Sequence, residues 1–382
     1  MENKLSEIFK WLHRHPELAL KEYKTNEFLR KALLDAGICL LDTKTETGLI
    51  AVIGSGKPPV IALRADMDAL PIQEETGLPY ASETPGVMHA CGHDFHAACM
   101  LGAAMLLKER EAVLPGTVKV IFQPAEEIDR GANLMIKTGL LNDVRLFLAG
   151  HTYPWLPAGT IGIRQGPVMA SADRFSVCIG GKGCHAANPD MGTDPIPALG
   201  AVISAFQTIV SRRLDPFDGA VVSITRVQSG NTWNVIPETA ILEGTVRAMR
   251  ETVRCNIRQS LEQLAVNTAK AYGCTAIFEY ENGPDPLFND AGVCETAKAV
   301  AGEVGLKVEE NPPSMIAEDF SRYLKLAPGA LFRIGTGGGY DNHHPMFTAD
   351  PAALLPAAKF FAKLAEKELT IDNYVSPDNS PR

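Results

Sequence analysis

The sequence predicts an α/β protein with two domains. A discontinuous larger domain would carry a largely parallel sheet flanked by helices, and a smaller ferredoxin-like (α+β) domain would be inserted into it. With 382 residues, 46% of them hydrophobic, the chain can bury two cores. Near both ends, apolar runs of strand length alternate with stretches of helical periodicity, which is typical of βαβ units. Between these parts the order becomes strand-helix-strand-strand-helix-strand, which is the split ferredoxin-like order.

The first part of the chain begins with two helices and continues in βαβ order. Apolar residues recur at helical spacing from Leu5 to Leu12 and from Asn26 to Ala36, and the short apolar runs GLIAVIGS and PVIALRAD then predict strands. We expect a helix from near Asp94 to near Glu111, the strand TVKVIFQ, a helix through Ala132 and Leu141, and the strand RLFLAGH. This alternation places helices on both faces of one sheet.

The middle of the chain has the split order. It consists of the strand RFSVCIG, a helix from Pro195 to Leu214, the strands AVVSITRVQ and ETAILEGTVRAM, a helix from Thr252 to Tyr272 and the strand TAIFEYE. The edge strands of the four-stranded sheet formed in this way are available for pairing with a second copy of the chain. We therefore expect a homodimer or a higher homo-oligomer.

The last part of the chain returns to alternating helices and strands, and it completes the larger domain. It has a helix from Asp290 to Val304, the strand ALFRIG and a helix from Pro351 to Leu369. We place the larger domain at residues 1–172 and 284–382 and the inserted domain at residues 173–283. The final segment, DNYVSPDNSPR, is polar and contains two prolines, so we expect a frayed tail.

Composition and charge limit the class of partner. A net charge of -9 and a pI near 5.6 disfavour nucleic acid and anionic membrane surfaces, and favour a small molecule. The N-terminal sequence has charge in every turn, and no apolar run is long enough to span a bilayer, so we expect a cytoplasmic location. The 8 cysteines are scattered without a CxxC pair, and we expect most of them to be reduced, buried and inert.

The segment MHACGHDFHAA is the most informative of the chain. Cys91 and His93 lie two residues apart at the start of a predicted helix, and Gly92 between them lets both side chains face one metal ion. On this segment alone, a buried cysteine beside a helix-capping histidine explains the pattern equally well. The choice between the two depends on the rest of the chain.

Further candidate ligands follow strands at their carboxyl ends, where open α/β sheets place their sites. Glu126 and Glu127 come after the strand VIFQP, and His151 follows the strand LFLAG. Adjacent carboxylates point in different directions, so one can bind a metal ion while the other acts as a base. Taken singly, a glutamate pair is more typical of a solvated surface, and a lone histidine of a satisfied core residue.

Two more segments fit the same pattern. YDNHHPMF follows the strand ALFRIG and three glycines, and because no helix with Lys, Ser or Thr comes next, a ligand histidine on a flexible loop fits better than a phosphate-binding loop. RADMD follows another strand and offers Asp66 and Asp68. For Asp68 we favour a supporting role that orients a ligating imidazole, with a salt bridge to a neighbour as the alternative.

The candidate ligands indicate which metals to expect. A thiolate, several imidazoles and a carboxylate suit zinc, manganese, cobalt or nickel, and do not suit calcium or magnesium. Their number fits two divalent metal ions per subunit. At a separation of about 3.5 to 4 Å, two ions would activate a bridging water and polarise a carbonyl group.

Over nearly its whole length the sequence resembles the N-acyl-amino-acid amidohydrolases, a branch of the di-metal metallopeptidases that includes hippurate hydrolases and aminoacylases. The shared motifs, in order, are HPEL, RADMDALP, MHACGHDFHAA, FQPAEE, a strand-end His151, GPVMASAD, GKGCHAANP, NVIP, GTVR, EDF and HHPMF. The resemblance implies a metal-dependent hydrolase of linear, non-peptide amide bonds that acts on N-acyl-L-amino acids. It also implies a catalytic domain that holds the ions and a lid domain that forms a homodimer.

The resemblance also implies roles for individual residues. The metal ligands are matched by Cys91, His93, Glu127, His151 and His343, where His343 is chosen over its neighbour because the family's ligand is the first histidine of HHPMF. Glu126 matches the general base that takes a proton from the metal-activated water.

In the lid, His185 matches the residue that stabilises the oxyanion. Asn234 and Arg247 match lid positions near the substrate, although a turn residue and a strand-end salt bridge explain these two equally well.

The sequence departs from the family pattern at three positions and leaves two other functions open. Cys184 stands where Gly is commoner, Thr152 where Asn is common, and Ala317 where Gly or Ser is more usual, but none of these is a proposed ligand. A dipeptidase remains open because a dipeptide is also an N-acyl amino acid. The other alternative is a non-catalytic metal-binding protein that kept the fold.

Overall fold

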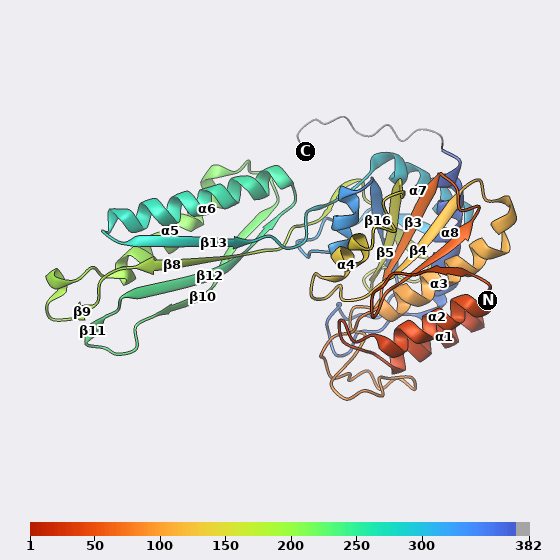
Figure 1. The fold of residues 1–382 in the computed structure, drawn as a ribbon, viewed down its shortest axis with the longest axis horizontal. Helices are drawn as coiled ribbons and strands as arrows, with labels where there is room; N and C mark the ends of the chain where they lie inside the picture. Colours follow the sequence, from red (N-terminus) through yellow and green to blue (C-terminus); the bar gives the residue numbers. More distant parts are fainter. Residues whose placement is uncertain (372–382) are drawn as a thin grey trace. The chain divides into compact units, whose positions relative to one another are not determined.

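The computed structural model describes residues 1–371, so the predicted frayed tail lies outside the described residues. The chain divides into two compact units (Figure 1). Among the described residues, the first comprises Met1–Val168, Phe288–Pro312 and residues 319–371, and the second comprises Met169–Leu287 with Pro313–Glu318. The functions assigned above to the two domains stay predictions.

The first unit is built on an eight-stranded mixed sheet. In spatial order its strands are β1 (Cys39–Leu41), β2 (Leu49–Gly54), β4 (Thr117–Gln123), β3 (Val60–Asp66), β5 (Leu146–Tyr153), β16 (Gly329–Gly335), β6 (Thr160–Gly162) and β15 (Lys307–Glu309). The central strands β4, β3, β5 and β16 are parallel, whereas β2 runs antiparallel to both β1 and β4. The α/β class is therefore confirmed, with the parallel part confined mainly to the centre, because strands joined by a short turn such as β1 and β2 must be antiparallel.

Helices cover both faces of this sheet. One layer contains α1 (Glu2–Arg14), α3 (His93–Glu109), α7 (Ala291–Glu303) and α8 (Leu354–Leu369), whose apolar residues join the strands in one core. On the other face lie α4 (Gly131–Lys137) and the 3-10 helix η3 (Asp319–Lys325), as Figure 1 shows for α4. The remaining helix, α2 (Tyr23–Asp35), packs against β1 and β2.

The second unit has the predicted split order. Its sheet, in spatial order, is β10 (Ala220–Ser229), β12 (Thr239–Ala248), β8 (Asp173–Gly180) and β13 (Thr275–Glu281). The helices α5 (Pro195–Arg213) and α6 (Glu251–Ala271) lie together on one face, where α5 contacts β10 and α6 contacts β13 (Figure 1). A second apolar core fills the space between these helices and the sheet.

The elements not predicted from the sequence are short. They are the strands β1, β6, β7 (Gly166–Met169), β9 (Cys184–His185), β11 (Val235–Ile236), β14 (Leu287–Asn289) and β15, and the 3-10 helices η1 (Glu111–Val113), η2 (Pro189–Met191) and η3, whereas η4 (Pro351–Ala353) forms the start of the helix predicted from Pro351 to Leu369. Such lengths are too short for a periodic pattern to develop. The helix expected to reach Leu141 ends at Lys137 instead.

Within the described residues, no helix has both the length and the apolarity that a membrane crossing requires.

The direction of the central strands determines where the site lies. The strands β3, β4, β5 and β16 are parallel, so the segments that follow them all leave the sheet at the same end, which is the carboxyl end of these strands. These segments carry Asp68, Glu126 and Glu127, and the loop with His343, while His151 lies near the end of β5. The start of α3 brings Cys91 and His93 to the same carboxyl end of the sheet.

Candidate metal centre

Cys91 and His151 form one side of the cluster. The Cys91 Sγ lies 3.6 Å from the Nε2 of His151. The Nδ1 of His151 lies 2.9 Å from the Thr152 carbonyl oxygen, to which it donates, so Nε2 is left to face the cluster. Gly92 precedes α3 with a φ of 83°, and a Cβ built there would lie 2.6 Å from the Thr152 hydroxyl, so glycine is required on both counts.

His93 lies at the centre of the cluster and is completely buried. Its Nδ1 is 3.3 Å from Asp68 Oδ1, and its Nε2 is 3.8 Å from Glu127 Oε1. Neither ring nitrogen of His93 has a hydrogen-bond partner, and Glu127 Oε1 has none either, although all three atoms are buried. Buried polar atoms without partners are costly, and a metal ion between these two side chains would supply the missing interaction.

His343 completes the cluster from the loop after β16. Its Nε2 is 3.4 Å from Glu127 Oε1. The residue adopts a left-handed conformation with a φ of 66°, and its backbone N–H donates to the Ala90 carbonyl oxygen at 2.8 Å. The next histidine, His344, stacks on Tyr340 with ring centroids 4.7 Å apart. The ring of His343 therefore lies near the other candidate ligands, and its role as a ligand stays a prediction.

The ligand atoms fall into overlapping groups. Among the described residues, five sets bring their donor atoms within 4.8 Å of one another, and three of them contain at least two of the proposed ligands: Cys91 with His93 and His151, Cys91 with Glu127 and His343, and His93 with Glu126 and Glu127. Because Cys91, His93 and Glu127 each belong to two of these three sets, the donors surround two adjacent positions rather than one. The residues thus fit a pair of transition-metal ions.

The electrostatics of the cluster favour cation binding. Burial and the nearby Glu127 raise the pKa of the Cys91 thiol well above its usual range. Burial alone would lower the pKa of His93, but Asp66 and Cys91 outweigh it and hold that pKa well above its usual range. Since metal ligands must be deprotonated, uptake of metal ions would release protons from both side chains.

Asp68 contacts both the glutamate pair and His93, and its supporting role stays a prediction. Its two carboxylate oxygens accept hydrogen bonds from the backbone N–H groups of Glu126 and Glu127, each at 3.0 Å. The same carboxylate faces the ring of His93. One buried side chain thus fixes the backbone of the candidate base and of a candidate ligand together.

A second buried network, not predicted from the sequence, supports His151. The Nδ1 of His96 donates to Asp66 Oδ1, and its Nε2 accepts from the Thr152 backbone N–H at 2.8 Å. Asp66 is also bound by Arg64, which reaches Asp319 at 2.7 Å. Both nitrogens of His96 are therefore engaged, so we assign His96 a structural part rather than a ligand role. The sequence offered Asp66 of this network as a candidate beside Asp68, and a further visible signal was the arginine within an otherwise apolar strand.

Thr152, one of the departures from the family pattern, is part of a polar contact beside Cys91. Its hydroxyl donates to the Cys91 carbonyl oxygen at 2.9 Å and lies 3.3 Å from Asn342 Nδ2, which also donates to that carbonyl oxygen at 3.1 Å. Asn342 immediately precedes His343. The threonine therefore links the two loops that carry Cys91 and His343.

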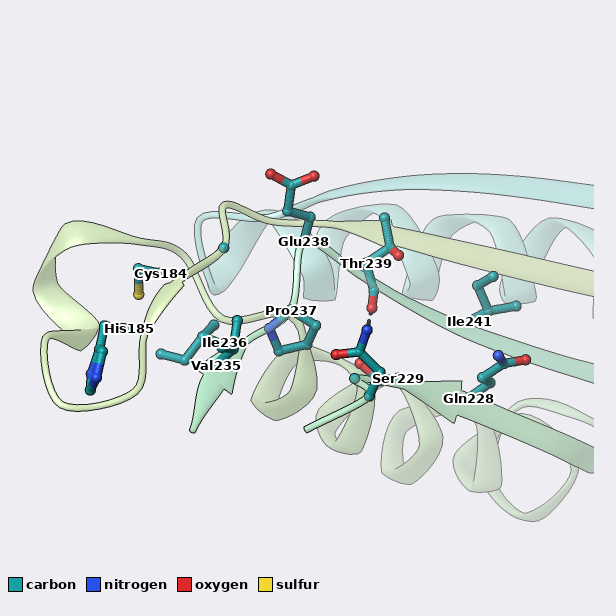
Figure 2. A pocket seen from close by; sticks show the side chains of 13 residues that line it. Cys184, His185, Gln228, Ser229, Val235, Ile236, Pro237, Glu238, Thr239 and Ile241 are labelled. Carbon is teal, nitrogen blue, oxygen red and sulfur yellow. Dashed lines mark hydrogen bonds between the residues drawn. The ribbon is translucent and has the colours of Figure 1, made fainter. Parts of the chain in front are cut away.

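The three remaining predicted residues belong to the second unit. His185 is exposed on the short ladder of β9 and β11, where it pairs with Val235, and its Nδ1 accepts from the Ala187 N–H. Figure 2 shows it beside Cys184 at one end of a pocket that extends to Gln228 and Ile241.

Asn234 and Arg247 have partners within their own unit. The Asn234 Oδ1 accepts from the Thr232 hydroxyl at 3.2 Å. The guanidinium of Arg247 donates to the hydroxyl of Thr245 and the carbonyl oxygen of Val246. These contacts neither require nor exclude substrate binding, so the substrate roles of both residues stay predictions.

Comparison with known proteins gives consistent matches over nearly the whole chain. A model of peptidase family M20/M25/M40 matches residues 62–367. The chain is 43% identical over 370 residues to an N-acetyl-L-cysteine deacetylase of Bacillus subtilis, which covers 97% of this chain and 89% of that protein. It is 46% identical over 356 residues to an N-acetylcysteine deacetylase of the same organism, with 93% and 94% covered. A solved B. subtilis structure, described as a dinuclear metal binding peptidase, superposes with a TM-score of 0.88 at 43% identity, covering 96% of this chain and 98% of the other.

Proposed function

The chain belongs to peptidase family M20/M25/M40, and from that premise we propose that it is a two-metal amidohydrolase that cleaves the amide bond of N-acyl-L-amino acids. The observation that carries this proposal is the pair Glu126 and Glu127. One carboxylate, Asp68, holds both backbones, while the Glu127 side chain reaches the cluster of candidate ligands. The similarity to two N-acetylcysteine deacetylases supports a short acyl group on the substrate.

The candidate residues divide the chemistry among them. Cys91, His93, Glu127, His151 and His343 would hold two divalent ions, and their donor types suit zinc, manganese, cobalt or nickel. Such a pair of ions supplies an activated water and polarises the substrate carbonyl group. Glu126 would take a proton from the attacking water and pass it to the leaving amine. His185 would donate a hydrogen bond to the oxyanion that forms on the carbonyl oxygen.

Metal removal tests the proposal directly. We expect chelation to abolish hydrolysis of an N-acetyl amino acid, because the two ions would supply both the activated water and the polarisation of the carbonyl group. Adding back manganese, cobalt, nickel or zinc should restore the activity. A metal-free protein that stays fully active would contradict the assignment.

A substrate panel separates the proposed activity from the dipeptidase alternative. Acetyl, benzoyl and longer acyl derivatives of one amino acid should be compared with dipeptides of the same amino acid. A preference for acyl groups without an α-amino group is expected of the amidohydrolase. Efficient cleavage of dipeptides, with poor cleavage of acetyl derivatives, would favour the alternative.

Two features of the second unit support a homodimer as the working form. Among the described strands β10 pairs with β12 alone, so its other edge is open. The helix beside it, α5, carries no charged residue before Arg212, and its outer face consists of small or uncharged residues such as Gly200, Ser204 and Gln207. Pairing of two β10 edges with packing of two α5 faces would make a self-complementary interface.

A further inference from the structure

The turn that carries the two glutamates adopts a backbone conformation that its sequence does not favour. Ala125, immediately before Glu126, has a φ of 54°. A residue with a Cβ atom is disfavoured in this left-handed region because the Cβ lies too close to the carbonyl oxygen. Something outside the turn must therefore hold Ala125 in place.

Two buried carboxylates bind three consecutive N–H groups of this turn. The N–H of Ala125 donates to Glu22 Oε1 at 2.9 Å, and the next two N–H groups donate to Asp68. On the opposite side, the Ala125 carbonyl oxygen accepts from the N–H of Gly131 at 3.0 Å. Both the N–H group and the carbonyl oxygen of Ala125 are therefore held by hydrogen bonds.

Glu22 comes from a distant part of the chain and is fully buried. Besides Ala125, its Oε1 accepts from the N–H of Leu20, a second left-handed residue with a φ of 62°, at 2.9 Å. Its Oε2 accepts from the Thr47 hydroxyl at 3.0 Å. The carboxylate therefore ties together three segments, and two of its partners are residues in a disfavoured conformation.

We propose that Glu22 is a positioning residue that holds Ala125 in its left-handed conformation and thereby directs the Glu126 and Glu127 side chains toward the reacting centre. This inference rests on the proposed roles of Glu126 and Glu127. Among the described residues, Glu22 belongs to none of the side-chain groups that could hold a metal ion. Its effect reaches the chemistry only through the backbone of residues 125–127.

A double substitution separates this role from ordinary packing. Glu22→Met removes the acceptor at similar length, and Ala125→Gly removes the penalty against a left-handed φ. In the natural background, Glu22→Met should lower kcat on the order of ten-fold with a smaller effect on KM, because the left-handed state loses its support. In the Ala125→Gly background, Glu22→Met should lower kcat only about two-fold to three-fold. Equal losses in the two backgrounds would overturn the proposal.

Hydrogen exchange on the metal-free protein gives a readout independent of activity. Glu22→Met should speed exchange of the amides of residues 125–127 on the order of ten-fold and weaken metal binding, because Glu127 is a proposed ligand. Unchanged exchange at these amides would overturn the proposal. If the natural protein neither binds metal nor cleaves amides, the proposed function fails, while exchange still tests the backbone role.

Conservative and matched variants complete the test. Glu22→Gln keeps a carbonyl oxygen as acceptor, so it should retain activity within about three-fold and speed exchange at the Leu20 and Ala125 amides only slightly. If Glu22→Met does not fold, this variant still decides, since a loss of kcat on the order of ten-fold with unchanged exchange at both amides would contradict the proposal. Glu17→Met is the control, because Glu17 accepts from the Thr25 N–H in the same segment but does not touch the turn. It should alter stability without altering exchange at residues 125–127.

Discussion

Glu126 and Glu127 are neighbours in the sequence but have different surroundings. Burial would raise the pKa of Glu127, but His343 and His93 outweigh it and keep that pKa below its usual value. Glu127 thus stays ionised, as a ligand must. Successive side chains on an extended or turning backbone point in different directions, which leaves Glu126 for proton transfer.

We expect Glu126→Gln to keep both metal ions while kcat falls by a factor on the order of 10² to 10⁴, which is the usual contribution of a general base. Metal content by elemental analysis and steady-state kinetics measure the two effects separately. Glu127→Gln serves as the contrast and should lose metal. If instead Glu126→Gln lost metal and Glu127→Gln kept it, the two roles would have to be exchanged.

A second prediction concerns His13, which is buried between two carboxylates. Burial alone would lower its pKa, but Asp94, at 2.6 Å, and Glu74, at 3.2 Å, outweigh it and raise the pKa of His13 to about 9. In the unfolded chain the pKa returns to about 6.5. The folded state therefore gains up to about 3 kcal/mol that is fully present below pH 6.5 and is lost as the pH rises through about 9.

Urea unfolding of the metal-free protein across this pH range measures the effect without interference from metal release. The natural protein should lose stability steadily between about pH 6.5 and 9. His13→Gln should be less stable at the acid end and should lose the part of this slope that His13 contributes, while the part from His93, whose pKa is also raised, remains. His15→Gln, a change at a partly exposed histidine of the same segment, should keep it. An unaltered slope in His13→Gln would contradict the assignment.

The sequence predicts those site residues that stand in short motifs and at strand ends. Cys91 and His93 share one loop, and Glu127 and His151 follow apolar strands, so chain direction alone brings them together. Glu22 could not be found in this way. Its partner Ala125 is 103 positions away, and an isolated glutamate before a helix is most often a surface residue. The contact of Glu22 with the turn at Ala125 appears only when the N-terminal segment packs against that turn in the folded chain.

At the scale of elements, prediction from sequence depends on length. The long helices α3, α5, α6 and α8 each bury a continuous face, so their apolar periodicity predicts them to within a few residues. The mixed character of the large sheet could not be predicted. It depends on which strands pair, and β2 and β4 are antiparallel neighbours separated by a strand and a helix in the sequence.

The outer face of α5 gives a prediction at this scale. A Cβ added at Gly200 meets no atom within 4 Å, so Gly200→Arg fits the subunit and should not unfold it. Combined with Ser204→Arg, it places like charges across the proposed two-fold axis and should convert the dimer to a monomer in light scattering or sedimentation. Gln259→Arg on the exposed face of α6 is the matched control and should stay dimeric. A monomeric natural protein, or a charged variant that remains dimeric, would exclude this interface.

At the scale of the whole molecule, the order of predicted elements changes from alternating strands and helices to the split ferredoxin-like order and back. This change predicts two folding units, because each order of elements must bury its own core. The two cores are indeed separate, one around α3 and the other between the four-stranded sheet and α5 and α6. The sequence does not reveal which site a lid serves. That depends on the linkers and on the assembly, and neither leaves a periodic pattern in the chain.

His185 makes this question testable. It belongs to the second unit, whose sheet has the open edge, while Glu126 belongs to the first. As a consequence of the proposed dimer, we expect each active site to take Glu126 from one subunit and His185 from the other. Glu126→Gln and His185→Ala proteins, each inactive alone, should then complement one another when mixed under conditions that allow subunits to exchange.

The arithmetic of exchange decides between the two arrangements. After complete exchange roughly half of the dimers carry one subunit of each kind. If His185 acts in the partner, one site of each mixed dimer combines both substitutions and the other has neither, so roughly a quarter of all sites should be active. If His185 acts within its own subunit, every site lacks one residue and activity stays at the level of the unmixed variants. Two different affinity tags would establish that mixed dimers have formed, and mixed dimers without recovered activity would exclude a shared site.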